Sequence, residues 1–185
     1  MTWMTTKART RRREGVVKRE HVLRTGREVL RLLALYKGPQ VRKNERAIDP
    51  VVLGYLRGAG FTVSRQHNVW MYGSAKPHRI DFRVAGNPRS VIEFAVREAG
   101  GVQELSALKN HAELKKLSRV KQVDAHMRYL LLLDMSTTRG PIPRDDLEQD
   151  YGGYNAGKGK FKRNPVRVVY VHVADEYDFL WHPWV

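Results

Sequence analysis

Cysteine is absent from the 185-residue chain, and no apolar run in it approaches the length of a membrane span. Without cysteine there is no disulfide bond and no thiolate metal site, so zinc-finger proteins and disulfide scaffolds are excluded. The first residues also lack the apolar stretch of a secretory signal. Together these absences predict a soluble protein of the cytoplasm with no membrane partner.

Acidic residues are scarce relative to basic ones. The chain has 34 Lys and Arg against 19 Asp and Glu, a formal net charge of +15. Such an excess attracts polyanions and predicts nucleic acid as the partner, with DNA favoured over RNA. We expect residues 1–19 to form a flexible basic arm that contacts phosphates through Arg11, Arg12 and Arg13. A solvated tail or a localisation signal explains the same run.

The rest of the chain, residues 20–185, is expected to form a single α/β domain. Helical spacing of apolar residues, β-branched runs and turn residues define the predicted elements. In chain order these are helices at 20–36 and 49–60, strands at 61–73, 78–84 and 90–98, a helix at 101–117, and strands at 128–135 and 166–173. For the second helix, Asp49 is the expected N-cap, with Pro50 at the first helical position and Gly58 or Gly60 at the end. Residues 136–165 are expected to be a polar connection.

Two neighbouring predicted strands each carry one acidic residue, Asp81 and Glu93, within an apolar pattern. Because side chains alternate across a strand, both are expected on the same face of the sheet. Two carboxylates at such a place repel each other unless a cation lies between them, and Mg²⁺ prefers oxygen ligands of this kind. The alternative is an ordinary solvated face on which they pair with Arg79, Arg83 and Arg97.

An Asp, then Glu-Phe-Ala about ten residues later, then a helix and an apolar strand, resembles the PD-(D/E)XK nuclease superfamily, nearest its Holliday-junction-resolvase-like branch. The resemblance implies a restriction-endonuclease-like three-layer core, a mixed central sheet flanked by helices in the order α-α-β-β-β-α-β plus a C-terminal strand. It implies Mg²⁺ or Mn²⁺ held by Asp81 and Glu93, and a metal-dependent endonuclease that hydrolyses DNA phosphodiester bonds. Junction-cutting members are usually dimers, so a homodimer is compatible with it.

Two further site residues follow only from this resemblance, which covers about residues 44–135. Glu45, near the start of the second predicted helix, matches a Glu that approaches the metal in the junction-resolvase branch. Gln103, in the helix after the second acidic strand, matches a Gln that lies near the site.

Ala95 occupies the position of the motif Lys, and alanine can neither activate water nor stabilise a phosphate in its transition state. Three explanations remain. A basic residue elsewhere replaces the Lys, with Arg97, Arg83 and Lys109 as candidates. Alternatively, the chain descends from a nuclease and has lost catalysis, or the Lys was deliberately replaced.

The Gly- and Lys-rich run that begins at Gly152 fits a nucleotide-binding P-loop poorly, because Gly159 stands where Ser or Thr is required and a strand follows instead of a helix. We interpret the run as a surface loop whose basic residues contact phosphates and whose aromatic residues stack on bases. The predicted contacts are Lys158, Lys160, Lys162 and Arg163, together with Arg79 on the second strand. A flexible surface loop explains the run equally well.

Two other functions stay open. One is a non-catalytic DNA- or RNA-binding protein that retains the nuclease-like fold, with the carboxylates paired to arginines. The other is an RNA-binding protein that uses only the basic arm and the loop.

Overall fold

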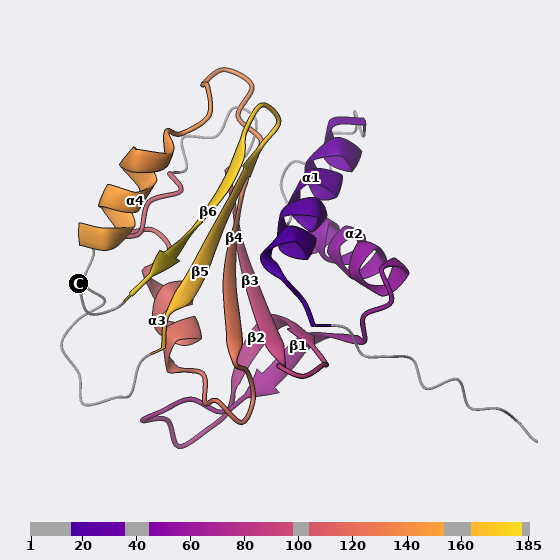
Figure 1. Cartoon of the computed structure of the whole chain (residues 1–185), viewed down its shortest axis with the longest axis vertical. Coiled ribbons are helices and arrows are strands. Elements are labelled where there is room, and N and C mark those ends of the chain that lie inside the picture. The colour runs from indigo at the N-terminus through magenta and orange to yellow at the C-terminus, as the bar shows by residue number, and fades with distance from the viewer. Residues whose placement is uncertain (1–15, 36–44, 98–103, 154–163, 183–185) are drawn as a thin grey trace, which may run out of the picture.

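The structure of the chain is a computed structural model that describes residues 16–35, 45–97, 104–153 and 164–182. It is an α/β fold in which helices cover both faces of a six-stranded mixed sheet (Figure 1). The helices are α1 (Arg19–Leu35), α2 (Glu45–Gly58), α3 (His111–Arg119) and α4 (Arg144–Gly153). The strands are β1 (Val63–Val69), β2 (His78–Val84), β3 (Ser90–Arg97), β4 (Met127–Asp134), β5 (Val166–His172) and β6 (Glu176–Trp181). The predicted order of the first seven elements is confirmed.

The strands lie in the sheet in the order in which they occur in the chain. Neighbours are antiparallel from β1 to β3, parallel from β3 to β5, and antiparallel again between β5 and β6. The centre of β4 is the continuous run of leucines 130–133, all buried. Such a run is what a parallel strand needs when helices cover both of its faces.

Each face of the sheet has its own apolar core. On one face, α1 and α2 contribute Val22, Val29 and Leu56, among others. On the other, α3 and α4 contribute Leu114, Leu117 and Tyr151. Helix α1 approaches β5 closely at Gly26, where a Cβ would lie 2.7 Å from a methyl group of Val171.

Helix α2 shows one wrong prediction and one correct one. It begins at Glu45, so Asp49 lies inside it and is not its N-cap; the buried Asp49 accepts a hydrogen bond from Arg65 Nη2 at 2.7 Å. The predicted end is correct, because Gly60 has a φ of 90°. The amides of Gly60 and Phe61 donate to the carbonyls of residues 57 and 56 at 2.9 and 3.0 Å, which completes a Schellman motif.

Three other boundaries differ from the predictions. Helix α3 starts at His111, ten residues later than expected, after a turn at 107–110. Helix α4 lies within the segment predicted to be a polar connection, and its only buried residues are Leu147 and Tyr151, too few to produce a periodic pattern. Strand β6 forms after the last predicted strand, in a segment for which no element was predicted. Across the described ranges, no helix is long and apolar enough to cross a membrane.

Candidate active site

Asp81 lies where β2 separates from β3. Backbone pairing of the two strands runs only from Val84 opposite Ser90 to Phe82 opposite Ile92. Beyond it, the amide of Phe94 donates to Asp81 Oδ2 at 3.3 Å, so a side chain takes over where a backbone acceptor would continue the ladder.

Strand β2 also changes the core against which it packs near Asp81. Phe82 belongs to the core under α1 and α2, whereas Ile80 belongs to the core under α3. The other oxygen of Asp81 accepts a hydrogen bond from Gln66 Nε2 at 3.3 Å. Gln66 has a φ of 47°, a left-handed conformation that non-glycine residues seldom adopt. Gln66 thus combines a strained backbone conformation with a side-chain amide that contacts the Asp81 carboxylate. Nothing in the sequence indicated this contact.

Glu93 is the partner that the alternation of β3 predicted. Its side chain faces α3, and the residue is only 2% exposed. Burial, and then hydrogen bonding and repulsion from Asp81, raise the pKa of Glu93 to about 9. The structure therefore brings the two predicted carboxylates together, and without a bound cation Glu93 holds its proton at neutral pH.

Lys116 is a residue of the site that the sequence did not single out. It extends from α3, and its ammonium group contacts Glu93 Oε1. The helix also directs Glu113 to the same site, and Lys109 lies just before it. The spacing of these three residues, four and then three positions apart, was the available signal, because it places them on one side of a helix.

These residues line a pocket of about 570 Å³ between the sheet and α3. Its charged lining residues are Asp81, Glu93, Glu104, Lys109, Glu113 and Lys116. Ala95 is also in the wall, so the position at which the motif of the resembled nucleases would have a Lys faces the carboxylates. Lys116 supplies a positive charge to the same pocket from the opposite wall.

Arg97 does not line this pocket, although we expected it as a replacement cation. It is buried and donates from Nε to Asp134 Oδ1 at 2.8 Å, and its Nη2 donates to Oδ2. The hydroxyl of Tyr170 donates to Asp134 Oδ2 at 2.5 Å. The cause is the parallel register of β3 and β4, which places Arg97 directly opposite Asp134.

The solvated-face alternative also differs from the structure. Within the described residues, neither Asp81 nor Glu93 forms an ion pair with Arg79, Arg83 or Arg97. Arg79 is exposed, and Arg83 is half-buried with its Nε lacking a hydrogen-bond partner. The basic residue in contact with Glu93 is Lys116.

Several predicted site residues lie outside the described residues and stay predictions. They are Gln103, Arg11, Arg12, Arg13, Lys158, Lys160, Lys162 and Arg163. The side chain of Glu45 is also outside them, although its backbone begins α2, which packs on the face of the sheet opposite the carboxylate pocket.

The donor set suits a hard divalent cation. Glu93 Oε1 is buried, and its neighbours are the Lys116 ammonium group and the Asp81 carboxylate. Mg²⁺ in proteins is commonly held by one or two carboxylates and keeps several waters, so Asp81 and Glu93 are an adequate set. A site with more protein ligands is not seen, since no group of three or more His, Cys, Asp or Glu residues within the described ranges could hold a metal.

The fold and the site define an α/β protein with a mixed sheet and a pocket built around two adjacent carboxylates. Comparison with known proteins adds no family to this description. No protein-family model matches the chain, and neither a curated protein nor a solved structure matches it.

Proposed function

We propose that the chain is a metal-dependent endonuclease acting on DNA phosphodiester bonds. The observation that carries the proposal is Lys116, whose ammonium group is placed on Glu93 beside Asp81 in the pocket that Ala95 lines. The order of the elements and the position of the two acids on adjacent strands add support, because the resemblance to PD-(D/E)XK nucleases implies both.

Asp81 and Glu93 would hold Mg²⁺ or Mn²⁺, which when bound polarises a phosphate and lowers the pKa of a bound water. Since burial and Asp81 raise the pKa of Glu93 to about 9, Glu93 must lose a proton to become a ligand. Lys116 stands in for the motif Lys: its N–H groups can orient water or neutralise charge that develops on the phosphate. Arg97 has no role in this mechanism because its guanidinium group is hydrogen-bonded to Asp134.

A second function, nucleic-acid binding without hydrolysis, is favoured by one specific observation. The Lys116 ammonium group already contacts Glu93 Oε1 without a metal, so this contact can be purely structural. In that case the positive charge of the chain would bind nucleic acid while the pocket does no chemistry.

The test is cleavage of supercoiled, linear, branched and single-stranded DNA with Mg²⁺ or Mn²⁺. We expect Asp81→Asn to abolish cutting and Lys116→Gln to slow it by about 100-fold, the usual effect of removing one positioned catalytic group. Lys115→Gln, which removes an exposed charge from the next position of α3, is the matched control and should cut normally.

Two other outcomes would count against the nuclease proposal. Cutting that survives Asp81→Asn would show that the carboxylate pair is not the site. Absence of cutting on every substrate, with salt-sensitive binding retained, would favour the second function.

A further inference from the structure

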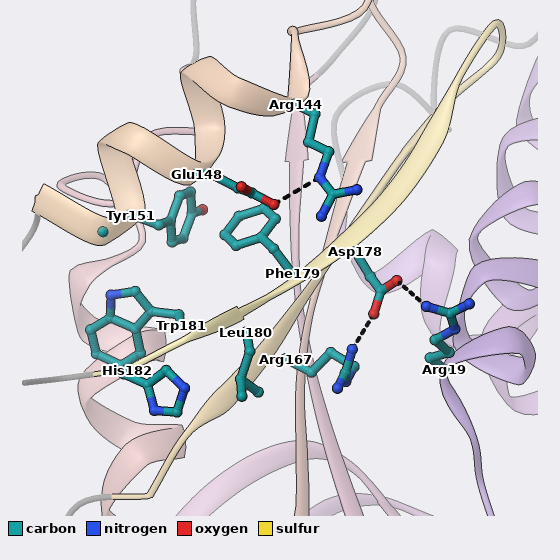
Figure 2. A pocket seen from close by; sticks show the side chains of 11 residues that line it. Arg19, Arg144, Glu148, Tyr151, Arg167, Asp178, Phe179, Leu180, Trp181 and His182 are labelled. Carbon is teal, nitrogen blue, oxygen red and sulfur yellow. Dashed lines mark hydrogen bonds and ion pairs between the residues drawn. The ribbon is translucent and has the colours of Figure 1, made fainter. Parts of the chain in front are cut away.

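A second pocket, of about 430 Å³, lies between α4 and β6 (Figure 2). Three arginines line it, and each comes from a different element: Arg19 from the start of α1, Arg144 from the start of α4, and Arg167 from β5. Its wall includes Tyr151 and Trp181, which belong to the core on the side of the sheet that α3 and α4 cover. Residues of the same core line the carboxylate pocket. We call this second pocket the arginine pocket.

Two carboxylates fix the orientation of the three guanidinium groups. Arg19 Nη1 donates to Asp178 Oδ1 at 3.1 Å, and Arg167 donates to the other oxygen of Asp178. Arg144 Nε donates to Glu148 Oε1 at 2.7 Å. Each of these contacts uses one nitrogen of a group that carries five N–H donors, so each group has donors that these contacts do not use. Three guanidinium groups against two carboxylates leave the pocket with net positive charge.

The indole of Trp181 gives an independent sign of a missing acceptor. Trp181 is 1% exposed, yet its Nε1 has no hydrogen-bond partner. Figure 2 shows this nitrogen on the edge of the ring directed toward α4 and Tyr151. A buried donor without an acceptor costs about 1 to 3 kcal/mol, so native proteins seldom leave one.

The arginine pocket and the carboxylate pocket share a wall. Tyr151 lines the former, while its hydroxyl accepts a hydrogen bond from Asn110 Nδ2 at 3.0 Å and donates to the carbonyl of Leu105 at 3.3 Å. Both Asn110 and Leu105 line the carboxylate pocket. The buried Tyr151 thus lies between the two pockets.

From these observations we infer that the arginine pocket binds a backbone phosphate of the same nucleic-acid strand that the carboxylate pocket engages. Arginines bind phosphate through paired N–H donors. The inference rests on the proposed function only for the choice of nucleic acid as ligand. It makes the substrate a polymer and assigns the arginine pocket to holding the strand in register.

The first test is binding of a fluorescently labelled DNA duplex, measured by anisotropy in EDTA over a range of salt concentrations. Arg144→Gln should weaken binding several-fold and reduce the slope of log K against log salt by about 0.9, the value for one lost phosphate contact. The matched control is Arg31→Gln on α1: Arg31 and Arg144 have side chains that are 59% and 58% exposed, and each pairs with a Glu of its own helix. Its slope should change much less.

Equal slopes for the two variants would overturn the inference, because a general loss of charge would then explain the effect. EDTA prevents cleavage, so the result does not depend on whether the chain is a nuclease. If Arg144→Gln weakens binding and no substrate is cut, the inference stands and the nuclease proposal fails.

The second test follows the Trp181 indole N–H by NMR, with its signal assigned from the spectrum of Trp181→Phe. Adding the same duplex should shift this signal, since Trp181 lines the pocket that the phosphate would enter. A signal that does not move while the protein is saturated with DNA would show that no phosphate reaches the pocket, and would overturn the inference as well.

Discussion

Replacing Glu93 with Gln should change how the stability of the protein depends on pH. Burial and the nearby Asp81 raise the pKa of Glu93 to about 9, whereas an unfolded glutamate titrates near 4.5. Between these values the folded protein holds a proton that the unfolded chain releases. The favourable contribution of the protonated form is therefore complete below pH 4.5 and is lost as the pH rises toward 9.

The size of the effect follows from this difference. One proton difference changes the free energy of unfolding by about 1.4 kcal/mol for each pH unit, or about 4 kcal/mol between pH 5 and pH 8. Gln does not titrate, so Glu93→Gln should not lose this stability. The free energy of unfolding of the variant, relative to that of the wild type, should therefore increase by about that amount as the pH rises across the window.

Urea unfolding followed by circular dichroism at several pH values measures this difference. Glu104→Gln is the control, because Glu104 lines the same pocket but is exposed. Its stability should run parallel to that of the wild type from pH 5 to pH 8. If the curves of Glu93→Gln and wild type were also parallel, the deduction that Glu93 is protonated in the folded protein would be refuted.

Three other predictions concern the metal, the buried ion pair and the packing of α1. Binding of Mn²⁺ near pH 7 should release protons, because Glu93 must ionise to become a ligand; calorimetry in buffers of different ionisation enthalpy would show it, and no release would contradict the protonated state. Asp134→Ala should destabilise the protein by about 3 to 5 kcal/mol in urea unfolding, because it leaves the Arg97 charge buried without a partner; a loss under 1 kcal/mol would mean that water reaches Arg97. Gly26→Ala should lower stability by about 1 to 3 kcal/mol through a clash with β5, whereas Gly54→Ala, with nothing within 4 Å of the new Cβ, should be neutral or stabilising; equal effects would refute the close approach.

The parts of the structure that the sequence predicted are those set by local rules. Alternation along the strands was enough to place Asp81 and Glu93 on one face, because both lie within short strands with clear apolar patterns. The end of α2 was equally predictable, since Gly60 has the positive φ that a helix terminus of this type requires. Neither feature depends on how distant segments pack.

The parts that could not be predicted depend on the docking of distant segments. Lys116 reaches Glu93 only because α3 packs across β3 at a particular height, and Arg97 meets Asp134 only because β3 and β4 pair in a particular register. Helix α4 has two buried residues, so its sequence shows too little periodicity to separate it from a loop.

The hydrogen bond from the Phe94 amide to Asp81 links the β1–β2 hairpin to the rest of the sheet. Strands β1 and β2 form a hairpin that stays attached to the rest of the sheet through three backbone pairs at one end and through this carboxylate beyond them. The hairpin is held a second time just after β1, where Met71 pairs with Val120 in an isolated bridge. The position of Asp81 relative to Glu93 therefore depends on pairings at both places, so the spacing of the two carboxylates is a property of the whole sheet.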